Sequence, residues 1–141
     1  MADITDTNAD MDFTWSDVWL LQAVAMAARK KPASLSDIVA RGDAIQHAIF
    51  TFEELSCGLR KLIAARLVVF EGDRFQIVPS FVPIYVRLEK RARSWTGNND
   101  AVARFLKSIS PHAIDSSSNP SHFDLKLENY DEAVRRYVGK L

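Results

Sequence analysis

Residues 51–78 constrain the fold more than any other stretch, because they have the pattern of a capped helix that leads straight into a hairpin. Thr51 and Glu54 have capping-box spacing, in which each side chain accepts a hydrogen bond from the other residue's backbone N–H. The apolar side chains that follow recur at helical spacing and share one face: Leu55, Leu59, Leu62 and Ile63. The sequence therefore predicts a helix that begins at Thr51 and buries one side.

A hairpin pattern follows this helix without a linker. Two short apolar runs, 68–70 and 75–78, flank Glu71-Gly72-Asp73, whose residues favour a tight turn. We therefore expect two antiparallel strands joined by that turn.

A first helix is predicted upstream, beginning at Thr14, where Asp17 repeats the capping spacing, and running toward Ala28. Its end is marked by Arg29-Lys30-Lys31-Pro32, because cations favour a helix C-terminus and proline disfavours helical geometry in the residue before it.

A second helix is predicted to begin at Ser34, again with an aspartate, Asp37, three residues later. Gly42-Asp43 interrupts its pattern. The apolar spacing of residues 44–49 leaves open whether they continue the helix or form a separate turn.

Beyond the hairpin, residues 83–95 have the pattern of a helix with Ile84 and Leu88 facing inward, and Thr96-Gly97-Asn98-Asn99 is expected to end it. A shorter helix is expected over residues 100–109.

The C-terminal part is predicted to form a loop, a strand and a helix. Residues 110–121 are rich in turn formers, residues 122–127 alternate apolar and polar side chains, and residues 130–138 have a helical pattern. The strand needs an edge to pair with, and the hairpin, a second copy of the chain and a partner protein all remain open as that edge.

Composition limits the functional classes. The chain has 141 residues with 18 basic and 18 acidic side chains, so no overall charge draws it to nucleic acid or to an anionic membrane. We expect residues 1–13 to form a disordered acidic leader, because the stretch carries four aspartates and no basic side chain. The longest apolar stretch, residues 18–28, is too short to span a bilayer, so no membrane span is predicted. The cytoplasm is the expected compartment, because the single cysteine fits a reducing environment.

No motif of catalytic chemistry is present. His47, His112 and His122 lack the spacing of a metal-ligand pair, and neither a nucleophile elbow nor a phosphate-binding glycine loop occurs. We therefore predict a protein that is not an enzyme, with no catalytic residue, metal or cofactor. Cys57 is the only cysteine, which excludes an internal disulfide and fits a reducing compartment. Near two basic side chains, Cys57 is either a redox-sensitive thiolate or a small packed residue.

Three helices followed by a hairpin, over about residues 14–79, resemble the winged helix-turn-helix domains of MarR-type and related bacterial regulators. The similarity extends along residues 54–68, where a leucine-rich helix turns into the first strand of the wing. That turn usually carries a glycine where this chain has Arg66, so either its geometry differs or Arg66 adopts a left-handed conformation. The resemblance implies a DNA-binding transcriptional regulator that forms a homodimer through the elements after Pro79.

In DNA-binding members of this fold the third helix enters the major groove of double-stranded DNA. The DNA contacts implied by the resemblance are Lys30, Lys31, Ser56, Arg60, Lys61 and Arg74. Charge argues against them, because residues 51–79 carry four basic and four acidic side chains, whereas a DNA-reading surface is basic. The alternative is a winged-helix protein-interaction module that does not bind DNA. Its acidic side chains would meet a basic protein partner: Glu53, Glu54, Glu71 and Asp73.

A further basic cluster follows the hairpin. Arg87, Lys90 and Arg91 share one helix face at i, i+3, i+4 spacing. This cluster is either a solvated helix face or a contact for phosphate or for an acidic partner.

Together these patterns predict an α+β fold that is mainly α. A winged helix-turn-helix covers residues 14–79, and a helix–strand–helix extension over residues 80–141 packs on it or forms the dimer.

Overall fold

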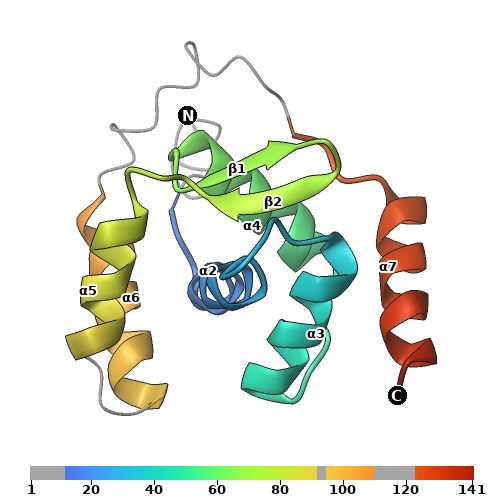
Figure 1. Cartoon of the computed structure of the whole chain (residues 1–141), viewed down its shortest axis with the longest axis horizontal. Helices are drawn as coiled ribbons and strands as arrows, with labels where there is room; N and C mark the ends of the chain where they lie inside the picture. The colour runs from blue at the N-terminus through green and yellow to red at the C-terminus, as the bar shows by residue number, and fades with distance from the viewer. Residues whose placement is uncertain (1–11, 92–94, 110–122) are drawn as a thin grey trace, which may run out of the picture.

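The computed structural model describes residues 12–91, 95–109 and 123–141, which form a mainly helical α+β fold (Figure 1). The predicted leader and the predicted loop over residues 110–121 fall almost entirely outside these ranges. Within them there are six helices and one antiparallel sheet of two strands. The elements are α2 (Trp15–Ala27), α3 (Leu35–Gln46), α4 (Phe52–Ala64), β1 (Val68–Glu71), β2 (Arg74–Ile77), α5 (Val82–Arg91), α6 (Trp95–Ser108) and α7 (Leu127–Gly139).

The helix α2 is the central element of the fold. The hairpin lies across one side of it, α5 and α6 lie on one flank, and α3 lies on the other flank with α7 outside it (Figure 1). Residues 17–25 of α2 are buried all round, as expected for a helix that is apolar on every face. No helix in the described ranges is long and apolar enough to cross a membrane.

The three predicted helix starts are confirmed. Thr14, Ser34 and Thr51 are the N-cap residues of α2, α3 and α4, and each forms a capping box with the acidic residue three positions later. At α4 the Thr51 N–H donates to Glu54 Oε1 at 2.9 Å, and the Glu54 N–H donates to Thr51 Oγ1 at 3.1 Å. Local side-chain chemistry therefore sets where these helices begin.

Gly42-Asp43 does not interrupt α3, contrary to the prediction. The helix continues to a C-cap at His47, whose φ of 58° is left-handed. Gly42 is required by packing, because a Cβ there would overlap the ring of Phe50. That ring stacks on Trp19, whose indole N–H donates to the Gly42 carbonyl at 2.9 Å.

The exit from α4 is left-handed at Arg66, whose φ is 62°, so the second of the two predicted possibilities holds. The Arg66 N–H donates to the Ile63 carbonyl and the Leu67 N–H to the Leu62 carbonyl, both at 3.0 Å. This pair of hydrogen bonds is the Schellman arrangement, in which a glycine is usual at the left-handed position.

The hairpin forms as predicted. Phe70 of β1 lies opposite Phe75 of β2, and Gly72-Asp73 closes the turn between Glu71 and Arg74. Both turn residues have positive φ, 57° and 63°, which is the type I′ geometry that matches the twist of the strands. Ala33 forms an isolated bridge to Phe75 on the other edge of β2, with both N–O distances at 2.8 Å.

The junction of α5 and α6 differs from the prediction. The sequence places the end of one helix at residues 96–99, but α6 begins at Trp95 and contains them. Val102 and Leu106 of α6 are buried in the core, and such packing outweighs the low helix propensity of Gly and Asn.

The inward face of α5 also differs. Tyr85 is its buried residue, and the ring of Tyr85 contacts that of Phe81. Ile84, predicted to face inward, is 38% exposed, while Leu88 is half-buried.

The predicted strand over residues 122–127 is wrong in its described part. Residues 123–126 have no regular structure, and α7 begins at Leu127, earlier than predicted. His122 lies outside the described ranges.

The apolar alternation of this segment has another cause. Phe123 packs edge-on against Phe70 and Phe75, and Leu125 is buried. These side chains therefore cover the inner face of the hairpin, and residues 123–126 pair with neither of its strands. Leu125, Val102 and Leu106 join one hydrophobic cluster with residues of α2, α3 and α4. The division at about residue 80 stays a prediction.

Candidate functional site

The helix α4 buries one face and exposes the other. The buried apolar and small residues are Leu55, Gly58, Leu59 and Leu62. Glu53, Cys57 and Arg60 are exposed, and Ser56 is half-buried beside them. We call this exposed surface the α4 face. Two of the predicted DNA contacts, Ser56 and Arg60, belong to it.

Lys61 does not belong to the α4 face, which corrects the prediction. Its side chain is 10% exposed, and its Nζ lies 2.6 Å from Asp17 Oδ2 and donates to the Asp12 carbonyl at 2.9 Å. Asp17 is only 2% exposed, so the pair lies in the interior between α2 and α4. A charge in such surroundings needs its counter-charge, and Lys61 is therefore unavailable to a phosphate.

Burial of Lys61 changes the balance of charge that α4 and the hairpin expose. Residues 51–79 are left with three cations against four carboxylates. The cations are Arg60, Arg66 and Arg74, and the carboxylates are Glu53, Glu54, Glu71 and Asp73. Binding to duplex DNA draws its affinity from cations that displace counterions from phosphates, and this surface carries no excess of them.

Lys30 and Lys31 are exposed at a different edge of the sheet. They precede Ala33, which pairs with one edge of β2. The helix α4 leads into β1, which pairs with the other edge of β2. The structure therefore does not gather these lysines with Ser56 and Arg60 into one surface.

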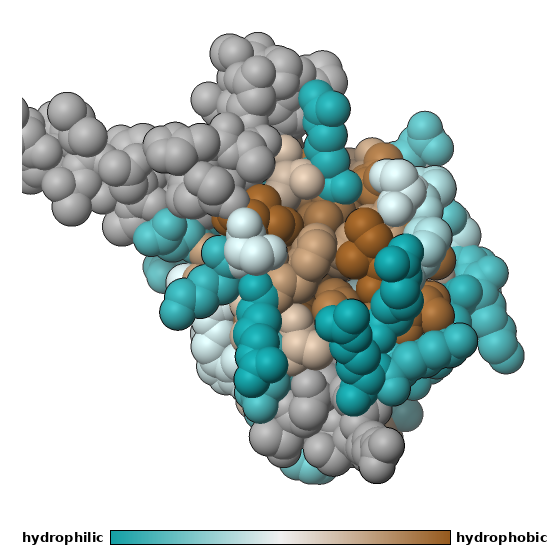
Figure 2. Space-filling view, turned by 90° about the vertical axis from the view of Figure 1, so that its left-hand side faces the viewer, coloured by the Kyte–Doolittle hydropathy of each residue, from teal (hydrophilic) through white to brown (hydrophobic). Residues whose placement is uncertain are grey.

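Lys30 and Lys31 line a groove formed with α5. This α5 groove encloses about 510 Å³ between α5, the connection from α2 to α3 and the end of the hairpin. Its main apolar residues are Ile77, Pro79, Val82 and Val86. Figure 2 views the flank formed by α5 and α6 and shows an exposed apolar strip between projecting hydrophilic side chains.

An ion pair joins the two sides of the α5 groove. Arg29, which follows the C-cap of α2, lies 2.5 Å from Glu89 of α5. Arg87, Lys90 and Arg91 are exposed on the same helix. Two basic clusters that are distant in the sequence are thus brought together, which the spacing of residues along the chain does not indicate.

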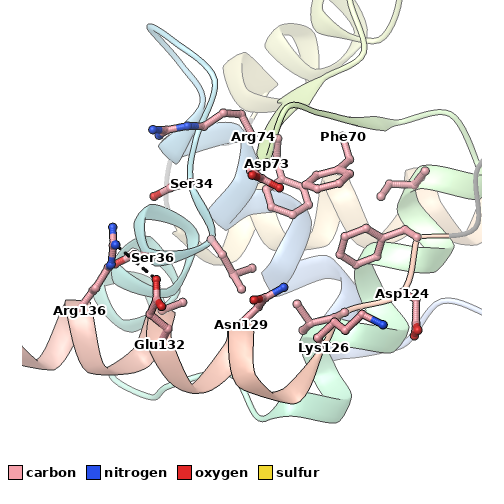
Figure 3. Close-up of a pocket in the computed structure, with 16 residues that line it drawn as sticks. Ser34, Ser36, Phe70, Asp73, Arg74, Asp124, Lys126, Asn129, Glu132 and Arg136 are labelled. Atoms are coloured by element: carbon pink, nitrogen blue, oxygen red, sulfur yellow. Dashed lines mark ion pairs between the residues drawn. The ribbon is translucent and has the colours of Figure 1, made fainter.

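A larger cavity, of about 760 Å³, lies between the hairpin, the start of α3 and α7. Figure 3 shows hairpin side chains facing those of α7 across it. The charged residues around it are balanced: Arg74, Lys126 and Arg136 against Asp73, Asp124 and Glu132. Arg136 is paired with Glu132 at 3.3 Å. Because residues 123–126 had the pattern of a strand, sequence reasoning did not find this cavity.

Two tyrosines fasten α7 to the rest of the fold. The Tyr130 hydroxyl donates to the Phe50 carbonyl at 2.6 Å, and the Tyr137 hydroxyl donates to Asp43 Oδ2. Burial, followed by the charges of nearby carboxylates, raises the pKa of Tyr130. The hydrogen bond to Asp43 is the largest cause that raises the pKa of Tyr137.

Cys57 is exposed on the α4 face, with Arg60 Nη2 at 3.7 Å from its sulfur, so it is not the packed small residue of the sequence interpretation. The tightly packed neighbour is Gly58, where a Cβ would lie 2.5 Å from Leu20 Cδ2. Among the described residues no group of three or more His, Cys, Asp or Glu side chains is arranged to hold a metal ion.

No protein-family model, no curated protein and no solved structure matches the chain. The α4 face, the α5 groove and the charges that surround them are the features of the structure that bear on its function.

Proposed function

We propose that this protein is a non-enzymatic winged-helix regulatory module that acts through protein contacts rather than by reading DNA. The order of elements supports the winged-helix assignment: α2, α3 and α4 precede the β1–β2 hairpin. The bridge between Ala33 and Phe75 ties the connection between α2 and α3 to the hairpin.

The burial of Lys61 against Asp17 is the main observation that favours protein contacts over DNA binding. It removes one of the cations that a recognition helix would direct at DNA. Glu53 stays on the α4 face and would lie close to the phosphates of a duplex in the major groove. Exposed Glu71 and Asp73 at the tip of the hairpin add to the repulsion. These acidic side chains suit a basic protein partner.

DNA binding is the second candidate, and exposed Arg60 on the α4 face favours it. A labelled random-sequence duplex titrated with the full chain separates the two candidates. We expect no binding at micromolar protein and low salt. Binding that weakens steeply between about 50 and 200 mM salt would reveal phosphate contacts and overturn the choice of protein contacts.

An Arg60→Gln variant serves as the matched control in that titration. If the duplex binds the unmodified chain, loss of affinity in Arg60→Gln would place the DNA on the α4 face. Unchanged affinity would place it elsewhere, and the α5 groove would then be the first basic surface to test.

Homodimer formation through the elements after Pro79 stays a prediction. The chain has a mass of 15.9 kDa, so sedimentation in the micromolar range distinguishes a monomer from a dimer directly. A monomer throughout that range contradicts the dimer, and the proposal for the α4 face does not depend on it.

A further inference from the structure

We propose that the α5 groove binds an acidic peptide segment of a partner protein, with apolar side chains of the peptide anchored on Val82 and Val86. This site is separate from the α4 face, and it does not depend on whether that face contacts protein or DNA.

The floor of the groove is apolar and open to solvent. Val82 and Val86 are 42% and 39% exposed, although both belong to a helix that is packed on its other side. They are four residues apart and so share a face of α5. Pro79 and Ile77 extend the apolar surface toward the hairpin. Exposed apolar side chains that are clustered rather than scattered indicate a surface that a partner covers.

Basic residues flank the apolar floor, and we call them the banks of the groove. Lys30 and Lys31 line the groove itself, while Arg87 and Lys90 are exposed on α5 beyond its lining. Lys90 continues the stripe of Val82 and Val86 at the same spacing of four residues. In the described part of the chain, none of these four cations has a carboxylate within ion-pair distance.

The acidic residue in the groove is already neutralised. Glu89 of α5 lines the groove, and Arg29 pairs with it at 2.5 Å. A ligand that enters the groove therefore meets uncompensated positive charge around an apolar floor. Charge complementarity of this kind selects an acidic partner and disfavours a basic one.

A second copy of this chain fits the surface poorly. In a two-fold symmetric interface each patch meets its own counterpart, which would bring Arg87, Lys90 and Arg91 of the two copies together. Nucleic acid fits less well than a peptide, because single strands stack their bases on aromatic side chains and Tyr85, the aromatic residue of the groove, is 5% exposed. An amphipathic acidic helix would place apolar side chains at i, i+4 spacing on the floor and its acidic side chains near the basic residues of the banks.

Fluorescence anisotropy with the full chain and three labelled synthetic peptides tests the proposal. The first peptide is acidic with leucines at i, i+4 spacing, the second replaces those leucines with serine, and the third replaces its acidic residues with lysine. We expect the first peptide to bind about tenfold or more tightly than either of the others, because it alone meets both the floor and the banks.

Two variants locate the bound peptide. Val86→Asp should weaken binding of the first peptide by about tenfold or more. The new carboxylate would be covered by an apolar side chain of the bound peptide, and it would repel the acidic residues of the peptide. The matched control is Val138→Asp, because Val138 is 47% exposed on α7, on the opposite flank from α5 in Figure 1. Val138→Asp should leave the affinity unchanged, and circular dichroism checks that both variants fold.

Three outcomes would overturn the proposal. Equal loss of affinity in both variants would mean that the peptide binds elsewhere. Equal binding of the leucine and serine peptides would show a simple anion patch without a docking floor. A dimer in sedimentation that Val86→Asp converts to monomer would assign the groove to a second copy of the chain. The duplex titration, compared with its Arg60→Gln control, reports on the α4 face, so failure of one proposal is distinguishable from failure of the other.

Discussion

The Lys61 ammonium lies 2.6 Å from the Asp17 carboxylate, and this ion pair joins α4 to α2 in the interior of the protein. The same carboxylate oxygen accepts the backbone N–H of Thr14 at 2.7 Å, so one side chain both caps α2 and neutralises Lys61. The pair also explains Gly58, because a Cβ there would lie 2.9 Å from Asp17 Oδ1. A lysine expected to contact DNA is thus part of the core.

Removal of the positive charge from this pair should be strongly destabilising. In Lys61→Met the Asp17 carboxylate is left buried without its counter-charge, and we expect a loss of about 3–5 kcal/mol in the free energy of unfolding. Chemical denaturation measures it. The double variant Asp17→Asn with Lys61→Met keeps the cap acceptor and removes both charges, so it should recover much of the loss. Equal stability of Lys61→Met and the unmodified chain would contradict the buried pair.

Gly58→Ala should also destabilise the protein. The added methyl would lie 2.5 Å from Leu20 Cδ2, so the buried Leu20 side chain or the helices that carry the two residues must shift, and overpacking of this kind costs about 1–3 kcal/mol. The matched control is Gly139→Ala near the end of α7, where an added Cβ meets nothing within 4 Å. Thermal unfolding should show a lower midpoint for Gly58→Ala alone, and a similar midpoint in both variants would refute close packing at residue 58.

Arg66→Gly should stabilise the protein. Arg66 has a φ of 62°, which a side chain makes unfavourable and glycine adopts freely. We expect a gain of about 1 kcal/mol or less, because glycine also increases the entropy of the unfolded chain. Arg66→Ala separates this effect from loss of charge, since it keeps a Cβ and should give no gain. The denaturation midpoints of the unmodified chain, Arg66→Gly and Arg66→Ala test this expected gain in stability.

Alkaline pH should loosen α7. The pKa values of Tyr130 and Tyr137 are raised above 10.0 in the folded protein, so folding favours the protonated phenols. Their contribution to stability is complete below pH 10 and is lost as the pH rises through the raised values. Denaturation midpoints at about pH 9 and 11, with phenolate absorbance, should show this loss. In Tyr137→Phe the loss should be smaller, and an identical pH dependence would contradict a role for its hydrogen bond to Asp43.

Features that depend on neighbouring residues were predictable from the sequence. Thr14, Ser34 and Thr51 start their helices because each cap is completed within three residues. The turn at Gly72-Asp73 follows for the same reason, since a residue without a Cβ lies where a positive φ is needed.

Features that depend on packing were not predictable from the sequence. Gly42 looked like a helix break, but the ring of Phe50 occupies the space that a Cβ would take. Residues 123–126 looked like a strand, but Phe123 packs on the aromatic face of the hairpin. In both cases a distant aromatic ring decided the outcome, and no spacing rule along the chain contains that contact.

The sequence by itself determined where α2, α3 and α4 begin and that a hairpin follows them, because backbone hydrogen bonds at caps and turns are satisfied locally. Only the tertiary structure decided what the charged residues do. It buried Lys61 against Asp17, and through the pair of Arg29 and Glu89 it placed the two basic clusters beside one groove. The physical reason is that burial and charge pairing depend on distance in space, which separation along the chain does not determine.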